Sequence, residues 1–214
     1  IRRDLVELDH QGFLKRVHGG AILISKMTST NEDPLTKRQQ LHLEEKRKIA
    51  KYSAKLIEAG DVVYIDAGSS TLELIEYLDQ KEAHYITNGL VQAQQLTLKG
   101  FHVVSLGGEV RNITGACVGS TTLLALQRYH FTKGFFGTNG IDVNAGFTTP
   151  DSEEAMIKQK AMERSRISYV LADHSKFNCV YPVNFGKIED AMILTDYCEN
   201  ELKEIATIVE VKEL

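Results

Sequence analysis

The stretch DAGSST, residues 66–71, places a carboxylate, a glycine and three hydroxyl side chains side by side. It follows the apolar run VVYI and precedes LELIEYL, so it should connect a strand to a helix. Gly68 would let a ligand approach the backbone. The N–H groups of the first helical turn, with the hydroxyls of Ser69, Ser70 and Thr71, would then bind a phosphate or carboxylate. A serine that merely caps the helix fits this stretch equally well.

Polar turns of the same kind follow several other apolar runs of the chain. In an open parallel sheet, ligands bind beyond the carboxyl ends of the strands, so these turns would share one edge. Each turn alone is more often structural, but together they predict a pocket for a small polyhydroxylated anion, with Lys176, or alternatively Arg111 or Lys158, supplying positive charge. The predicted binding residues are Asp66, Gly68, Ser69, Ser70, Thr71, Asn88, Gly107, Gly108, Asn139, Gly140, Asp142, Thr148, Asp173 and Lys176.

Several signatures of enzymes are absent from the sequence. The chain contains no GxGxxG after a strand, no Walker GxxxxGK[ST], no HExxH and no GxSxG. Its seven histidines are scattered, so the sequence predicts neither a metal site nor a cofactor.

The elements that would position these turns alternate regularly. Apolar runs of four to seven residues alternate with amphipathic segments, which predicts an α/β fold with a mainly parallel sheet and flanking helices. In the last long helix, Thr149 should be the N-cap and Pro150 the first residue. Strands are expected at 62–66, 84–87, 102–106, 131–137, 167–172, 191–195 and 205–211, and helices at 41–61, 70–78, 90–98, 120–129 and 150–164.

Composition limits the class of protein. The 214 residues are 43% hydrophobic and carry a net charge of −4, so the body is not a general nucleic-acid binder. The three cysteines, Cys117, Cys179 and Cys198, form no CxxC pair, which favours a reducing cytoplasm. No apolar run reaches membrane-spanning length and no signal peptide is recognisable, so no membrane association is expected.

The first 25 residues differ from the body. Ile1, Leu5 and Leu8 repeat at helical spacing, Gln11-Gly12 should end that helix, and 13–20 alternate like a hairpin with two adjacent cations. Because Ile1 already has the spacing of a helix interior, part of this unit is expected upstream. We interpret 1–25 as the end of one domain, 26–39 as a polar linker and 40–214 as a second domain.

The opening IRRDLVELDHQGFLKRVHGGA resembles the end of the winged helix-turn-helix of DeoR-type bacterial regulators, with IRRDL in the recognition helix and GFLKRVHGGA as the wing. Downstream, DAGSSTLELIEYL, TNGL, LGGEVR, GTNGIDVNAGFTTPDSEEA and LADHSKF occur in the order of that family's effector-binding domain. The resemblance implies an effector domain similar in fold to ribose-5-phosphate isomerase, a phosphorylated sugar as effector, and a homo-oligomer. The DNA-binding residues would be Arg2, Arg3, Lys15, Arg16 and His18.

The sequence thus predicts a DNA-binding transcriptional regulator, a repressor of a sugar-utilisation operon, rather than an enzyme. The alternative is a sugar-phosphate isomerase or a related small-molecule enzyme. The related isomerases need carboxylates and a lysine near the turn that corresponds to TNGIDVN; here Asn139 stands where one carboxylate is expected and no lysine follows. The stretches YIDAGSSTLELI and GFTTPDSEEA are most similar to fructose-responsive repressors, which favours a ketohexose phosphate.

Overall fold

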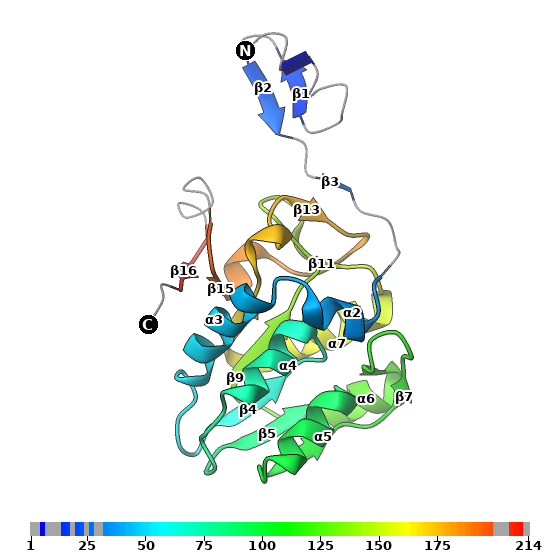
Figure 1. Cartoon of the computed structure of the whole chain (residues 1–214). Helices are drawn as coiled ribbons and strands as arrows, with labels where there is room; N and C mark the ends of the chain where they lie inside the picture. Colours follow the sequence, from blue (N-terminus) through cyan, green and yellow to red (C-terminus); the bar gives the residue numbers. More distant parts are fainter. Residues whose placement is uncertain are drawn as a thin grey trace.

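The computed structural model describes residues 5–6, 14–17, 20–23, 26–27, 32–198 and 206–211. The predicted N-terminal hairpin is confirmed: β1 (Leu14–Val17) pairs antiparallel with β2 (Gly20–Leu23). Figure 1 shows this hairpin beyond the end of the body, to which β3 connects it.

A parallel sheet forms the centre of the body, as the strand–helix alternation predicts. Every pairing between its seven strands is parallel, in the order β16-β15-β12-β9-β4-β5-β6. The order reverses between β4 and β9, because β5 and β6 extend the sheet to one side and β12, β15 and β16 to the other. The strands are β4 (Val62–Ile65), β5 (His84–Thr87), β6 (Val103–Ser105), β9 (Phe131–Gly137), β12 (Ser165–Leu171), β15 (Met192–Thr195) and β16 (Ile208–Glu210).

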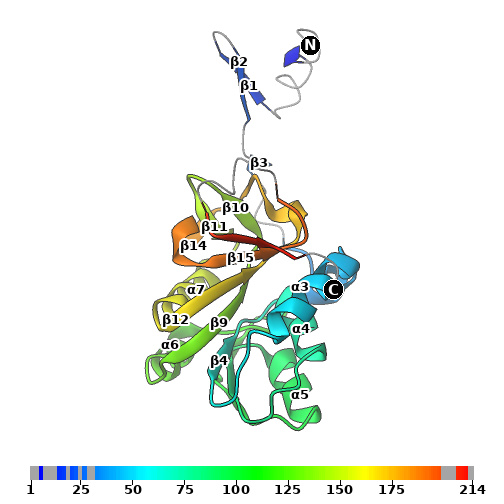
Figure 2. The ribbon, with the colours of Figure 1, turned by 90° about the vertical axis from the view of Figure 1, so that its left-hand side faces the viewer.

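Helices cover both faces of this sheet, as Figure 2 shows. Successive strand residues point to opposite faces. Val63 and Phe135 therefore join the core under α3, α4 and α5, whereas Tyr64 and Phe136 join the core under α6 and α7. No helix among the described residues is long and apolar enough to cross a membrane. The helices are α3 (Leu43–Ala54), α4 (Ser69–Glu76), α5 (Leu90–Leu98), α6 (Gly119–Leu126) and α7 (Ser152–Glu163).

Short elements beyond the main sheet form a smaller layer. An antiparallel sheet joins β10 (Gly140–Asp142), β11 (Gly146–Thr149) and β14 (Val183–Gly186). Next to it, β13 (Cys179–Val180) pairs with β3 (Lys26–Met27). The remaining short elements are β7 (Glu109–Val110), β8 (Cys117–Val118) and the 3-10 turns η1 (His174–Lys176) and η2 (Ile188–Asp190).

Two local predictions were wrong. The segment 26–39 is not merely a polar linker, because it contains β3 and most of a helix, α2 (Leu35–Gln40), whose backbone is tied to the body by Leu35 N–H donating to Ile113 over 3.0 Å. Thr149 is not the N-cap of α7 but the last residue of β11. Asp151 is the N-cap, and its carboxylate accepts from the Glu154 amide at 2.9 Å.

Candidate functional site

A polar pocket lies where β4 and β9 end side by side. In open α/β sheets the reversal of strand order leaves a crevice at this point, because the loops after the two strands lead away from each other. Five predicted binding residues line the pocket: Gly68, Ser69, Ser70, Asn139 and Lys176. The other lining residues are Arg38, Leu41, Lys46, Ala67, Gly137, Thr138, Glu154 and Lys158.

The N-terminus of α4 forms one wall. The helix begins at Ser69, one residue earlier than predicted, and its N-cap is Gly68 with no side-chain capping bond. This removes the alternative in which a serine is the N-cap. A Cβ atom at position 68 would lie 3.3 Å from Thr71 Oγ1 and 3.7 Å from Gly137 Cα, so the wall is closely packed. The N–H groups of the first turn lack partners within the helix and favour an anion.

A buried ion pair forms the floor. Lys158 on α7 pairs with Asp66, and its ammonium group also donates to the Gly137 carbonyl at 3.0 Å. The Gly137 amide in turn donates to Asp66 Oδ2 at 3.0 Å. These bonds connect the ends of β4 and β9, and both charged side chains are almost fully buried.

Two further lysines face the pocket from different elements. Lys46 on α3 is buried, and its ammonium group donates to the Arg38 and Leu41 carbonyls at the end of α2. Burial lowers the pKa of Lys46 to about 8, although nearby Asp173 raises it. Lys176 lies in η1, half-buried, 4.0 Å from Asp173 Oδ2. The pocket thus has cationic side chains on several sides.

Acidic groups border the pocket as well. Burial raises the pKa of Asp173, but Lys176 and hydrogen bonds from Ser175 outweigh it, so the net pKa lies below its usual value. Glu154 accepts from Thr114 Oγ1 at 2.6 Å and lies 3.2 Å from Arg111 Nε. Its pKa is raised by burial in spite of Lys158. Asp173 Oδ2 is buried and lacks a hydrogen-bond partner among the described residues, with the ammonium group of Lys176 at 4.0 Å.

Some predicted residues support the pocket without lining it. Thr71 Oγ1 donates to the Asp66 carbonyl at 2.6 Å, which fixes the turn after β4. Asn88 accepts from the Tyr64 hydroxyl at 2.8 Å and from the Ala67 amide at 3.2 Å. With Asp66 and Asp173, these buried residues hold the loops that form the pocket.

Other predicted residues do not lie at the pocket. Asp142 Oδ1 accepts from the Asn144 and Ala145 amides and so stabilises the turn from β10 to β11. The reason is that β10 carries the chain away from the end of β9, into the smaller sheet. The same holds for Gly140 and Thr148 in that sheet, and for Gly107 and Gly108, which lie in the loop that packs on Thr122 of α6.

Sequence reasoning missed Arg38, Lys46 and Glu154, and it offered Lys158 only as an alternative. The signal available for the last two was their spacing of four residues, which puts them on one face of α7. Arg38 was assigned to the linker 26–39, and Lys46 to the helix at 41–61 with no role in the site. Both line the pocket because α2 and the start of α3 pack at the carboxyl ends of the strands.

Two histidines that are distant in sequence come together beside the pocket. His42, His174 and Glu45 each offer a ligand atom, and these atoms lie within 4.8 Å of one another. Asp196 Oδ2 lies 2.7 Å from His174 Nδ1 and raises the pKa of that imidazole. This group could hold a divalent cation, with Asp196 orienting one ligand. Distance between the histidines in the sequence was therefore a poor reason to expect them apart in the fold, because the fold brings His42 and His174 together.

The predicted DNA-binding residues fall mainly outside the described part. Arg2, Arg3 and His18 are not described. Lys15 and Arg16 lie in β1, where their backbones pair with Ile22 and Ala21 of β2. The wing-like hairpin is thus present, whereas contact of these side chains with DNA stays a prediction.

A polar pocket rich in cationic side chains lies at the switch point of a parallel sheet, and an N-terminal hairpin precedes this α/β domain. The chain belongs to the DeoR family of transcriptional regulators. The model of the DeoR C terminal sensor domain matches residues 41–197, and that of the DeoR-like helix-turn-helix domain matches residues 1–27.

Individual relatives agree with this assignment. The uncharacterized HTH-type transcriptional regulator FruR of Bacillus subtilis is 44% identical over 93% of this chain and 79% of its own length. Lactose phosphotransferase system repressors of Streptococcus mutans and Staphylococcus epidermidis are 33% and 36% identical, over 95% and 99% of this chain and 81% and 85% of their own lengths. The chain is accordingly a DNA-binding transcriptional regulator and not an enzyme, and the isomerase alternative is not favoured.

Solved structures show similarity at a lower level. Ribose 5 phosphate isomerase A of Neisseria gonorrhoeae aligns with 67% of this chain and 55% of its own chain, at 15% identity and a TM-score of 0.47. The eIF2B delta subunit of Chaetomium thermophilum aligns with 64% of this chain and 50% of its own, at 16% identity and a TM-score of 0.49.

Proposed function

We propose that the pocket binds a phosphorylated sugar, with a ketohexose phosphate favoured, and that this effector controls operator binding in a repressor of a sugar-utilisation operon. The observation that carries the proposal is the convergence of Arg38, Lys46, Lys158 and Lys176, from four different elements, on the N-terminus of α4. A phosphate dianion accepts from such a donor set. Lactose phosphotransferase system repressors among the relatives support a sugar-derived effector.

A thermal-shift panel tests the effector. A ligand at one hundred times its dissociation constant adds about 2.7 kcal/mol to stability, which for a chain of this size raises Tm by about 5–11 °C. We expect that shift with fructose 1-phosphate or fructose 6-phosphate and little with fructose, because the phosphate contributes most of the binding. Lys187→Ala, which removes an exposed lysine outside the pocket, should keep the shift. No shift with any sugar phosphate would contradict the proposal.

The DNA-binding part of the proposal rests on the hairpin and on the helix that the sequence predicts before it. Arg2 and Arg3 would contact bases or phosphates from the recognition helix, and Lys15, Arg16 and His18 would contact the backbone from the wing. Replacing Arg2 and Arg3 together by Ala should weaken the shift of an operator duplex in electrophoresis relative to the unsubstituted chain, because two predicted DNA contacts are lost. Equal, sequence-specific affinity of both forms would contradict this.

Action on DNA also implies a cytoplasmic location.

We further propose that two copies associate through α5 and β6. Leu98 is 73% exposed and Leu90 52% exposed, and both line an apolar groove beside β6, the last strand on that side of the described sheet. An unpaired strand edge next to apolar side chains suits a second copy of the same surface. Light scattering should show that the unsubstituted protein is an oligomer and that Leu98→Glu dissociates it. The control Val143→Glu, in the turn of the smaller sheet, should leave the oligomer intact. A monomeric unsubstituted protein would contradict the proposal.

A further inference from the structure

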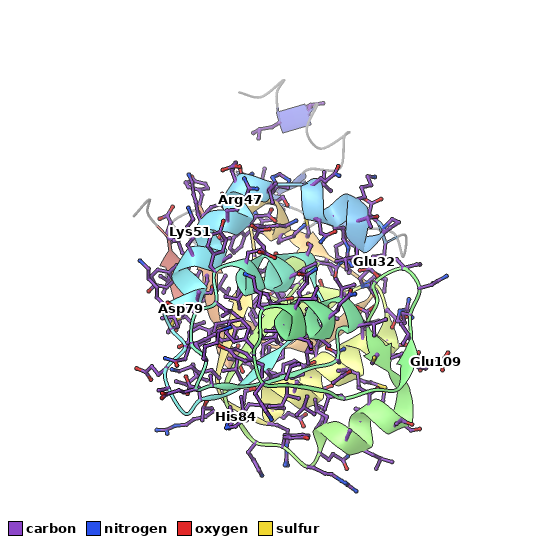
Figure 3. All side chains as sticks on the ribbon, turned by 60° about the horizontal axis from the view of Figure 1, so that its bottom comes forward. Glu32, Arg47, Lys51, Asp79, His84 and Glu109 are labelled. Atoms are coloured by element: carbon purple, nitrogen blue, oxygen red, sulfur yellow. The ribbon has the colours of Figure 1, made fainter. Side chains whose placement is uncertain are left out.

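The connecting segment forms the roof of the pocket. Residues 32–41, which precede α3, include Arg38 and Leu41 in the pocket lining. Glu32, labelled in Figure 3, reaches Asn139 in the opposite wall, where Asn139 Nδ2 donates to Glu32 Oε1 over 3.4 Å. With this roof in place the cavity measures about 40 Å³. About 10–15 Å³ of such volume is needed to hold one water molecule, so this cavity has room for a few water molecules but not for a sugar phosphate.

The roof is held by an ion pair that is poorly satisfied. Arg38 Nη1 lies 2.9 Å from Glu32 Oε1, and the side chains are 18% and 4% exposed. Nε and Nη2 of Arg38 and Oε2 of Glu32 are buried without a hydrogen-bond partner in the part of the chain that the structure describes. A buried ion pair offsets the cost of desolvation only when its remaining donors and acceptors are also satisfied. Three unsatisfied atoms therefore make this pair easy to replace.

A phosphate group would satisfy the same arginine better. The guanidinium fork presents parallel N–H donors that match two phosphate oxygens, so a phosphate could occupy the atoms that Glu32 leaves unbonded. A phosphate bound there would lie beside the Glu32 carboxylate, and the repulsion between the two anions would favour the departure of Glu32. Departure of Glu32 also frees Asn139 Nδ2 for a sugar hydroxyl.

We propose that Glu32 is an internal competitor of the effector: the phosphate takes over Arg38, expels the Glu32 carboxylate and releases the roof segment. This inference rests on the proposed function, since it takes a phosphorylated ligand in this pocket as given, and it adds the residue through which occupancy is sensed.

The position of the roof explains how release would reach the DNA-binding unit. The roof lies between the helix-turn-helix domain, whose match ends at residue 27, and the sensor domain, whose match begins at residue 41. Just before it, β3 pairs with β13, and β13 follows η1, which carries Lys176. At its end, Lys46 holds the Arg38 and Leu41 carbonyls. A ligand that displaces the roof thus acts on the segment that joins the hairpin to the sensor domain.

Glu32→Gln is the decisive variant because it removes the competing charge and keeps the shape. Asp33→Asn is its matched control, since Asp33 is the next residue and pairs with Lys37 in solvent, with the two side chains 45% and 61% exposed. Calorimetry with fructose 1-phosphate, fructose 6-phosphate and inorganic phosphate should show roughly tenfold tighter binding for Glu32→Gln if the closed roof is about 90% populated. Asp33→Asn should leave the dissociation constant unchanged, and Arg38→Lys should weaken binding because it loses the fork.

Amide hydrogen exchange on the unsubstituted protein tests the same inference without any variant. The amides of α2 should exchange faster when the sugar phosphate is bound, whereas those of α4 should exchange more slowly. In Glu32→Gln the α2 amides should exchange quickly even without ligand. Protection of α2 upon binding would overturn the inference, because it would mean that the roof closes further over the ligand.

The outcomes separate this inference from the proposed function. If the unsubstituted protein binds the sugar phosphate, but Glu32→Gln and Asp33→Asn bind it with equal affinity, the competitor role is wrong and the sugar-phosphate function stands. If neither the unsubstituted protein nor Glu32→Gln binds any of the phosphate probes, the proposed function is wrong and the competitor role is wrong with it.

Discussion

Two buried ion pairs border the pocket, and they differ in how completely their polar atoms are bonded. In the floor pair, Lys158 reaches both Asp66 and the Gly137 carbonyl, and Asp66 also accepts from the Gly137 amide. In the roof pair, Arg38 and Glu32 share one contact of 2.9 Å and leave three buried atoms without partners among the described residues.

This difference separates a fixed side of the pocket, the floor, from a side whose ion pair can exchange partners, the roof. A buried pair with a full set of hydrogen bonds is costly to break, because each charge would be left without compensation. A pair with unsatisfied atoms is easier to replace, because a new partner that bonds those atoms lowers the free energy. The floor joins β4 to β9 within the rigid sheet, whereas the roof belongs to the segment between the hairpin and the sensor domain. The following predictions test this contrast, starting with the largest effect.

Loss of the floor pair should be the most damaging change. Lys158→Met leaves the Asp66 carboxylate buried and unpaired, which typically costs about 3–5 kcal/mol. Urea unfolding should show a corresponding fall in the free energy of unfolding. The matched control is Lys160→Met on the same helix, whose partner Glu163 is exposed and whose loss should cost at most about 1 kcal/mol. Equal effects of the two substitutions would mean that the floor pair has no special structural role.

Removing a cation that faces the ligand should weaken effector binding without unfolding the domain. Lys176→Ala deletes a charge-assisted hydrogen bond worth about 1.5–3 kcal/mol, or about ten- to a hundredfold in affinity. The half-buried Lys176 side chain is not part of the floor. Calorimetry with the sugar phosphate and a thermal melt without it provide the two readouts. A large fall in the Tm of the free protein would show that Lys176 is structural instead.

Effector affinity should depend on pH through Lys46. Its pKa of about 8 means that the ammonium group loses its proton as pH rises from 7 to 9, and an anion then loses one of the positive charges around it. We expect affinity to fall by up to about tenfold over this range, because the protonated fraction of a group with a pKa of about 8 falls about tenfold between pH 7 and pH 9. Lys46→Gln should flatten the profile, and Lys51→Gln, exposed on the same helix, should leave it unchanged. A flat profile in the unsubstituted protein would exclude Lys46 as a contact.

The His174–Asp196 pair should make the smallest contribution. The hydrogen bond to Asp196 raises the pKa of His174, so the folded state binds the proton more tightly than the unfolded state does. Its stabilisation is therefore fully present below the unfolded pKa and is lost as pH rises through the higher folded pKa. Because the imidazole is 44% exposed, we expect less than about 1 kcal/mol. An NMR titration of His174 in the unsubstituted protein and in Asp196→Asn should differ in pKa; identical curves would contradict this.

Local sequence patterns were sufficient to predict the helices and strands and one wall of the candidate site. Alternating apolar runs and amphipathic segments identified the strands of the parallel sheet, because side-chain periodicity is a local property. The spacing of Ile1, Leu5 and Leu8 and the alternation after Gly12 separated the N-terminal unit from the body. The DAGSST stretch indicated an anion site because a strand, a glycine and a helix start were all visible within one short segment.

Which loops meet, and which charged side chains face them, depends on the tertiary packing of segments distant in sequence. The reversal of strand order brings the ends of β4 and β9 together, while β10 turns Asp142 away; neither is visible in a local pattern. Arg38 was placed in a polar linker, and Lys46 lies on the polar side of a predicted amphipathic helix. A local pattern reveals the apolar face of such a helix but not what packs against its polar face. The burial of Glu32, and with it the contrast between roof and floor, arises because residues distant in sequence enclose its side chain.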